Sequence, residues 1–322
     1  MNLASVIIIH YVHDHLTYQV LECLDRHQYT SPAEVIVVDN GSPRPFKNPN
    51  LPRLGFPRVL RLARGKGFGA ACQSGVDAIS PGCRQLPAIL LNNDISFDDD
   101  LVGGLIASLR DHPRAGLIGP RLVFPDGRFQ LSWGDDLTIS SEWREWRRQA
   151  QMRRGKGALY RDRIRQSATP RQVDWISGGA FLVTPDTIEA IGGLDRGYYF
   201  YFEDCDWSRR ARQAGKEVWF DPNMTVRHAL GAARPASSKD PNAVRFYRSR
   251  QLGRLRYYDL FSSWFQFQGI RAVIAMRVLS RGDFEMFAEL CRRGRGRARR
   301  LPTAWKQSEP TAALDSGKSE LV

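Results

Sequence analysis

Short apolar runs recur along the first 230 residues, separated by segments whose apolar residues have helical spacing. The strand-like runs, rich in Val, Ile and Leu, cover residues 4–9, 34–38, 59–62, 88–91, 115–119, 180–183 and 218–220. The helical segments cover residues 16–24, 65–79, 98–110, 185–191 and 203–214. Solid apolar strands that alternate with helices indicate a largely parallel sheet with helices on both faces. We therefore predict an α/β fold.

Polar residues follow several of these strands directly. Asp39 ends the second strand, Asn92-Asn93-Asp94 follows the fourth, and His10-Tyr11 follows Ile9 at the end of the first. Open α/β sheets bind their ligands at the carboxyl ends of the strands. We expect a ligand site there.

The pattern changes after about residue 232, where helical spacing dominates. Helices are predicted over 241–258, 260–279 and 283–291, and little remains to be buried after Arg292. The expected organisation is a domain over 1–230 with a basic insertion at 133–172, a helical region over 231–291 and a basic, disordered tail over 292–322. The insertion is expected to be an exposed helix and loop.

Composition narrows the class of protein. The 322 residues are 42% hydrophobic and 25% charged, which excludes a disordered, collagenous or disulfide-framework chain. We expect neither a membrane span nor a signal peptide, because no apolar stretch is long enough and no basic segment opens the chain. The five cysteines lack CxxC spacing, so we read them as reduced thiols of a cytoplasmic protein.

The net charge of +13 is concentrated in two places. Residues 144–171 hold nine arginines and one lysine against two acids, and residues 292–300 hold six arginines and no acid. Such patches suit nucleic acid, anionic lipid head groups or phosphorylated substrates, although a solvated basic face explains them equally well.

Two segments suggest contacts to a nucleotide. The carboxylate of Asp39 would accept the N3–H of uracil or thymine, or else form the turn that opens Asn40-Gly41. Small residues from Gly65 to Ala71, beside Arg64 and Lys66, would let a phosphate approach the backbone at a helix start. The segment fits GxGxxA only formally, because it follows the third strand rather than the first.

Acidic residues mark two further candidates. Asp94 would bind Mg²⁺ or Mn²⁺ on a diphosphate, or else belong to a turn that caps the next helix. In Tyr199–Trp207, four aromatic residues lead into Glu203, Asp204 and Asp206 at a helix start. Aromatic packing and the helix dipole would hold an ionised general base there, although capping and an Asp206–Arg210 pair are the simpler explanation.

Histidines add weaker candidates. His228 follows a strand end and would be structural or a metal ligand. His10, His13 and His15 lie within six residues, but no cysteine joins them and a zinc ligand set is incomplete.

Taken together, the order and spacing of these segments resemble the inverting GT-A glycosyltransferases of family two, in the bacterial rhamnosyltransferase-like branch. The resemblance covers about residues 4–230. The matching segments are SVIIIHY, EVIVVDNGS, RGKGFGAACQSG, ILLNNDISF, WISGGAFLVTPDTIEAIGGLDRGYYFYFEDCDWSRRARQAG and VRHALG. The resemblance implies a Rossmann-like nucleotide-diphospho-sugar transferase fold with a mostly parallel sheet and a C-terminal helical extension.

The resemblance also implies a role for each matching residue. Asp39 would hold the nucleotide base, with the backbone of Ile9, His10 and Tyr11 beside it. Arg64, Gly67 and Asn93 would line the nucleotide pocket, and Gly178 and Gly179 would approach the donor sugar. Asp94 and His228 would hold Mg²⁺ or Mn²⁺ on the diphosphate. Asp204 would be the general base, with Glu203 the second choice.

The implied reaction moves a sugar, with rhamnose the first guess, from a dTDP or UDP donor to a hydroxyl of a glycan or lipid-linked acceptor of the cell surface. The configuration inverts because one displacement occurs. The enzyme would be cytoplasmic and peripheral on the inner face of the cytoplasmic membrane. A C-terminal amphipathic helix would lie in an anionic lipid surface, or else pack on the catalytic domain.

Some positions depart from the family pattern. His10-Tyr11-Val12 replaces Asn-Tyr-Asn after the first strand, Gly65 replaces an Asn of the glycine loop, and Gln73 replaces a later one. These departures alter the nucleotide pocket. Asn92-Asn93-Asp94 also offers one carboxylate, so metal binding is expected to depend on the donor.

Two other functions compete with this interpretation. A sugar nucleotidyltransferase would need a Gly- and Lys-rich loop after the first strand, where this chain has HYVHDHL. A non-enzymatic nucleic-acid binder would explain the charge but not the acidic segments, so nucleic acid is not the partner we expect.

Overall fold

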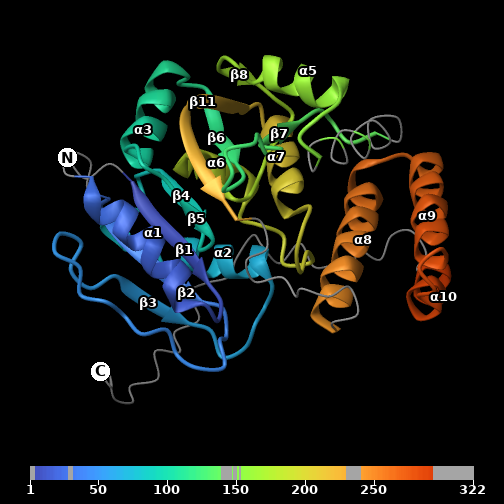
Figure 1. Cartoon of the computed structure of the whole chain (residues 1–322), viewed down its shortest axis with the longest axis horizontal. Helices are drawn as coiled ribbons and strands as arrows, with labels where there is room; N and C mark the ends of the chain where they lie inside the picture. Colours follow the sequence, from blue (N-terminus) through green and yellow to red (C-terminus); the bar gives the residue numbers. More distant parts are fainter. Residues whose placement is uncertain are drawn as a thin grey trace.

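The computed structural model describes residues 4–27, 32–138, 147, 151, 154–229 and 241–292. The expected basic tail after Arg292 and parts of the basic insertion lie outside the described residues. Figure 1 shows a central sheet with helices on both faces and three C-terminal helices along one side.

The sheet has nine strands in the order β3-β2-β1-β4-β10-β6-β11-β5, and β8 pairs with β11. Pairing is parallel from β3 through β4 and between β6 and β11, while β10 is antiparallel to both of its neighbours. The strands are β1 Ser5–His10, β2 Glu34–Asp39, β3 Arg58–Arg61, β4 Ala88–Asn92, β5 Ile95–Ser96, β6 Ala115–Val123, β8 Arg171–Gln172, β10 Ala180–Val183 and β11 Glu217–His228. A separate two-stranded sheet pairs β7 Trp133–Gly134 with β9 Trp175–Ile176. The predicted α/β class with a mostly parallel sheet is confirmed.

Helices follow the strands as the pattern predicted. They are α1 Asp14–Arg26, α2 Phe68–Asp77, α3 Leu101–Asp111, α5 Ala158–Gln166, α6 Pro185–Ile191, α7 Glu203–Gln213, α8 Pro241–Phe261, α9 Trp264–Leu279 and α10 Phe284–Arg292, with a 3-10 turn at Pro81–Cys83. No helix in the described part of the chain has the length and apolar character needed to cross a membrane. All five cysteines are free thiols.

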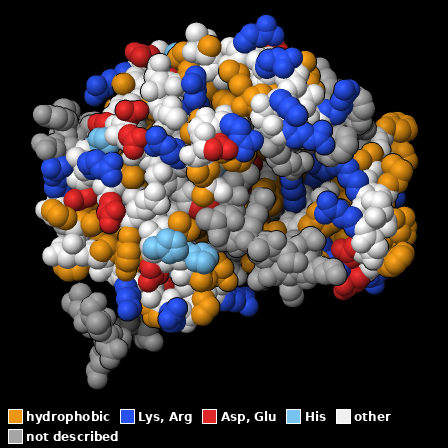
Figure 2. Space-filling view, in the orientation of Figure 1, with side chains coloured by type: hydrophobic (Ala, Val, Ile, Leu, Met, Phe, Trp, Pro, Cys, Tyr) orange, Lys and Arg blue, Asp and Glu red, His pale blue; other side chains and the backbone are white. Residues whose placement is uncertain are grey.

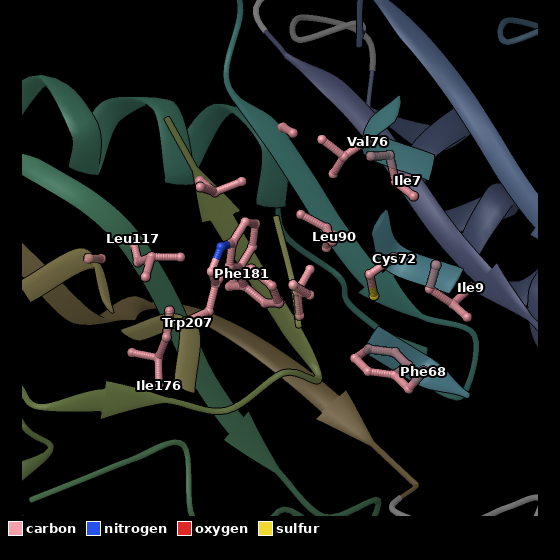
Figure 3. Packing of buried hydrophobic residues seen from close by; sticks show 14 of the residues in the cluster. Ile7, Ile9, Phe68, Cys72, Val76, Leu90, Leu117, Ile176, Phe181 and Trp207 are labelled. Carbon is pink, nitrogen blue, oxygen red and sulfur yellow. The ribbon is translucent and has the colours of Figure 1, made fainter. Parts of the chain in front are cut away.

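The alternation of side chains along β1 divides the core between the two faces of the sheet. Ile7 and Ile9 belong to the cluster on the side of α2 and α7, whereas Val6 and Ile8 belong to the cluster on the side of α1 and α3. Figure 3 shows Ile7, Ile9, Val76, Cys72 and Leu90 packed together, with Trp207 beside Phe181 further along the sheet. Both faces are therefore covered, as a parallel sheet requires.

The last strand is longer than the predicted strand over 218–220. The sequence Asp221-Pro222-Asn223 reads as a turn, but in the structure it is an irregularity inside β11. Asp221 pairs with Pro120 of β6, and the next pair joins Thr225 to Arg121. The residues between them bulge out, so the strand continues to His228.

The basic segment is less exposed than predicted. Trp133 is 1% exposed, and the guanidinium groups of Arg163 and Arg171 lie 3.7 and 4.3 Å from its ring centre. Arg163 itself is buried. The flat guanidinium group stacks on an aromatic face, which a solvated arginine would not need. The expectation of an exposed insertion is therefore wrong for Trp133 and Arg163, whereas Arg161, Arg165 and Gln166 on α5 are exposed.

The three C-terminal helices pack together and against the segment that precedes α7. Their buried side chains Tyr258, Ile270 and Leu290 share a cluster with Tyr198 and Cys205. Gly253 of α8 allows a close approach to this segment, since a Cβ there would lie 2.6 Å from the Tyr201 carbonyl oxygen. The buried side of these helices thus packs on the catalytic domain, which was one of the two alternatives expected from the sequence.

Candidate active site

Backbone pairing brings the predicted site residues to one edge of the sheet. His10 pairs with Asp39, and Ile9 pairs with Asn92, across adjacent parallel strands. The Asn92 N–H then donates to the Gly179 carbonyl, 2.9 Å away, at the start of the antiparallel β10. Strand ends from four different parts of the chain therefore lie side by side.

Gly178 and Gly179 connect the candidate base to the candidate metal ligands. The Gly178 N–H donates to Asp204 Oδ2 at 2.9 Å. A Cβ at Gly178 would contact Asp204 at 3.5 Å, and a Cβ at Gly179 would crowd His228 Nδ1 at 3.1 Å. The carboxylate and the imidazole therefore lie on either side of one dipeptide, and the tighter contact is at Gly179.

Asp204 is held at the start of α7 with part of its surface exposed. Its Oδ1 accepts the Cys205 N–H at 2.8 Å, in addition to the bond from Gly178. Burial raises the pKa of Asp204 above its usual range, and the two backbone N–H groups oppose that rise. A positioned carboxylate with a raised pKa suits a general base.

Glu203 has a different environment from its neighbour. Its side chain is 4% exposed, and its Oε2 has no hydrogen-bond partner. Burial, and secondarily the charge of Asp204, raises the pKa of Glu203 well above its usual range. Asp204 is partly exposed and oriented by two backbone N–H groups, whereas Glu203 is buried, so the geometry favours Asp204 over Glu203 as the base.

Asp206, the third acid of this segment, is structural. Its carboxylate accepts from Arg210 Nε at 2.6 Å, and Arg210 donates in turn to the carbonyls of Ile191 and Gly193. The simple i, i+4 pair considered from the sequence is thus present for this acid.

Asp94 and His228 meet at the other side of the glycine pair. His228 Nε2 lies 3.2 Å from Asp94 Oδ1 and 3.3 Å from Asn92 Nδ2. His228 Nδ1 lies 2.7 Å from Gln130 Oε1, a contact that assigns its proton to Nδ1 and the lone pair to Nε2. An orienting partner of this kind is typical of metal-binding histidines.

These residues fit a divalent ion in part. A carboxylate and an imidazole whose donor atoms lie 3.2 Å apart can both face one Mg²⁺ or Mn²⁺ ion. The described residues contain no group of three or more His, Cys, Asp or Glu side chains that could hold a metal by themselves. Any ion would therefore need ligands from a substrate or from water.

Asp39 forms the turn that the sequence offered as its alternative role. Its buried carboxylate accepts N–H groups from Ser42 at 2.9 Å and Phe46 at 3.2 Å, and Arg61 lies 3.4 Å away. Contact with a nucleotide base stays a prediction, and it would require these bonds to rearrange. The side chain of Arg64 is exposed.

The loop that precedes α2 passes so close to the backbone of Tyr199 that it requires a glycine. Gly67 has φ +89°, and a Cβ there would lie 2.3 Å from the Tyr199 carbonyl oxygen. That carbonyl accepts the N–H of Phe68, the first residue of α2, and Asn40 Oδ1 accepts the N–H of Lys66. The loop therefore binds the end of β2 to the aromatic segment before Asp204.

Side-chain contacts through Thr17 connect the first strand to the Asn92-Asn93-Asp94 turn. Buried His10 has its Nδ1 2.7 Å from Thr17 Oγ1, which also accepts from Asn93 Nδ2 at 3.3 Å. Burial lowers the pKa of His10, although Asp39 and Asp14 oppose that effect. Tyr11 is exposed beside it.

Backbone strain gathers around this edge. The non-glycine residues with positive φ in the described chain are Val12, Tyr201 and Phe202. Val12 follows the first strand, and the other two immediately precede Glu203 and Asp204. Strained conformations persist where surrounding structure holds them, and they cluster at functional sites.

Sequence reasoning missed Gln130 and Thr17. Gln130 is a buried neutral residue that carries no motif and lies 98 positions from the histidine it orients. Thr17 belongs to a helix whose spacing predicts only burial. Neither residue type signals a site without the fold.

The fold is that of the GT-A glycosyltransferases. A crystal structure of GalNAc-T7 with UDP, GalNAc and Mn²⁺ superposes with a TM-score of 0.50, covering 80% of this chain and 50% of that chain at 16% identity. The chain belongs to glycosyl transferase family 2, whose family model matches residues 5–167.

Two relatives with a named activity also match part of this chain. The N-acetylglucosaminyl-diphospho-decaprenol L-rhamnosyltransferases of Mycobacterium tuberculosis strains CDC 1551 / Oshkosh and ATCC 25618 / H37Rv are each 26% identical over 216 residues. The match covers 61% of this chain and 66% of each relative, which is just under two thirds of the relative's length. The predicted family and its rhamnosyltransferase-like branch are confirmed.

Proposed function

We propose that this chain is an inverting rhamnosyltransferase that uses a dTDP- or UDP-linked sugar. The acceptor would be a hydroxyl of a lipid-linked glycan, as the name of the mycobacterial relatives suggests. The observation that carries the proposal is the Gly178–Gly179 junction, which places Asp204 on one side and the His228–Asp94 pair on the other.

Asp204 is the general base of the proposed reaction. Its carboxylate takes the proton of the acceptor hydroxyl, whose oxygen attacks the anomeric carbon of the donor as the nucleoside diphosphate leaves. One displacement inverts the configuration. The bonds from Gly178 and Cys205 fix the direction of the carboxylate, so that little reorganisation precedes proton transfer.

Asp94 and His228 would hold Mg²⁺ or Mn²⁺. Bound there, the ion would offset negative charge on the departing diphosphate. The neighbouring Asn93 and the backbone of Ile9 to Tyr11 would line the nucleotide pocket with Arg64 and Gly67. Asp39 would contact the base after its turn rearranges.

The proposal places residues 1–230 in the catalytic domain and the acceptor beside the basic segment 133–172. It also places the protein in the cytoplasm, at the inner face of the membrane that carries a lipid-linked acceptor. Residues 231–291 would form the helical region on which this location depends.

Donor binding tests the proposal directly. We expect UDP- or dTDP-sugars to raise the melting temperature, and Mn²⁺ to increase that rise, in a thermal-shift panel that also contains GDP-sugars. Asp94→Asn should lose the effect of metal, and Asp98→Asn, on the exposed side of the following turn, is the matched control. A chain that no nucleotide sugar stabilises, with or without metal, would contradict the proposed function.

A further inference from the structure

The outer faces of α9 and α10 carry apolar side chains that nothing in the described chain covers. On α9, Phe265 is 79% and Met276 63% exposed, and Leu279 is exposed beside them. On α10, Phe284 is 70% exposed. Figure 2 shows hydrophobic side chains gathered along this edge of the molecule.

Helical spacing places the exposed apolar residues of α9 on one side of the helix, where Gln268 and Gly269 stand between Phe265 and the others. On α9, positions 265, 272, 276 and 279 share one face, and all four are apolar and exposed. The opposite face, which includes Phe267, Ile270 and Ile274, is buried against the rest of the C-terminal helices. The helix is thus apolar on two sides, and packing uses only one of them.

The charge on α9 is positive. Arg271 and Arg277 lie on the two sides of the helix, each about 120° around it from the exposed apolar positions, and α9 contains no acid. Asp283, just before α10, and Glu285 on α10 pair with Arg248 at 2.6 and 2.9 Å, and Glu289 is the other acid of this helix. An apolar stripe with arginines on the two sides of the same helix fits a surface that is apolar inside and anionic outside.

The chain continues from α10 into more positive charge. The sequence after Arg292 holds arginines at 293, 295, 297, 299 and 300 and no acid before residue 301. Two copies of this chain would each carry a net charge of +13, and like charges repel. An anionic lipid surface meets both the apolar stripe and the charge.

We propose that the stripe formed by Phe265, Met276, Leu279 and Phe284 is a docking surface for an anionic lipid bilayer. The apolar side chains enter the boundary between head groups and acyl chains, while the neighbouring arginines remain at the phosphates. The inference deepens the membrane location of the proposed function and rests on it, but it does not depend on the donor or on the reaction.

Vesicle flotation with the full chain tests it. We expect the protein to float with phosphatidylcholine vesicles that contain about one third phosphatidylglycerol, and much less with phosphatidylcholine alone. Replacing Phe265, Met276, Leu279 and Phe284 together by Ser should lower the bound fraction about tenfold or more. Phe56→Ser is the matched control, because Phe56 is 67% exposed in the loop before β3.

Further measurements separate the alternatives. Thermal shift with donor nucleotide should be unchanged in the Ser variant, which shows that it folds and that its donor site is intact. Replacing the five arginines from 293 to 300 by Gln should weaken binding without abolishing the effect of the stripe. Unchanged flotation of the Ser variant would overturn the proposal, as would a dimer in solution that the Ser substitutions convert to monomer. Failure of donor binding would instead count against the proposed function.

Discussion

Two adjacent carboxyl groups, on Glu203 and Asp204, have unlike surroundings and therefore unlike roles. Asp204 is partly exposed and accepts two backbone N–H groups, whereas Glu203 is buried with an unpartnered oxygen. Order along the chain cannot distinguish them. Their burial does, because a base has to be both reachable and oriented.

Asp204→Asn should abolish transfer, with kcat falling about 10³-fold or more, because the amide cannot take up the proton. Donor binding should be retained, since the amide oxygen can still accept the Gly178 N–H. Single-turnover transfer and isothermal titration with the donor measure the two effects. Loss of donor binding would assign Asp204 a structural role.

Glu203→Gln is the matched comparison, and we expect it to retain most of the activity. The raised pKa of Glu203 means that the folded protein keeps a proton that the unfolded chain loses, so the free energy of unfolding falls as pH rises above the usual glutamate range. Gln cannot ionise. Its gain in melting temperature should be larger at pH 8 than at pH 5, while Asp204 keeps its own part of the slope. Equal gains at both pH values would show that Glu203 is not protonated in the fold.

The sequence alone identified the acidic residues and the order of the motifs, but it did not identify the side chains that contact them. His228 and Gln130 are joined through the end of β11, and their sequence separation of 98 hides that contact. The resemblance to family two supplied the pairing of Asp94 with His228. The turn at Asp39 shows the converse, because its carboxylate is satisfied by its own loop.

At the scale of elements, the loop before α2 depends on one glycine. Gly67→Ala places a Cβ 2.3 Å from the Tyr199 carbonyl in a backbone conformation that L-residues avoid. We expect a loss of about 2 kcal/mol or more in the free energy of unfolding, and weaker donor binding. Urea unfolding and donor titration measure both.

Gly55→Ala is the control that separates the cost of a positive φ from the cost of a steric clash. Gly55 also has positive φ, but a Cβ there would meet no atom within 4 Å. Its cost should be about 1–2 kcal/mol, with donor binding unchanged. If Gly67→Ala cost no more than this control, the close crossing with Tyr199 would not matter.

The elements were mostly predictable because each strand is a compact apolar run and each helix has a clear period. The helices predicted over 260–279 and 283–291 lie within a few residues of α9 and α10. Pro222 hid the length of β11, because a proline between polar residues has the local chemistry of a turn. Thr184 stands at the N-cap of α6, yet its hydroxyl contacts Thr187 Oγ1 at 2.7 Å rather than the helix backbone.

At the scale of the whole molecule, α8 connects the C-terminal helices to the strained turn before the base. Arg250 and Arg254 lie 5.5 and 5.6 Å from the ring centres of Tyr201 and Phe202. Arg256 also pairs with Asp195. A shift of the C-terminal helices is therefore expected to shift Asp204 as well.

Gly253→Ala tests this link. The added Cβ would lie 2.6 Å from the Tyr201 carbonyl oxygen, so α8 has to move away from the turn. We expect kcat to fall about tenfold or more, because small displacements of a base are costly, while donor binding changes little. Gly82→Ala, whose Cβ would meet nothing within 4 Å, should leave kcat unchanged. Equal rates for both variants would show that α8 does not position Asp204.

The bulge in β11 has a consequence for how this chain can vary. Before it, Val218 and Phe220 point to the core beside α7, whereas Met224 at its end and Val226 after it point to the core beside α3. Three residues stand between paired neighbours, an odd number, so the strand's alternation changes phase there. Exposed Asn223 should therefore accept many side chains. The count of residues between Phe220 and Val226 is instead fixed in parity, because gaining or losing a single residue there would turn the imidazole at the strand's end away from its carboxylate.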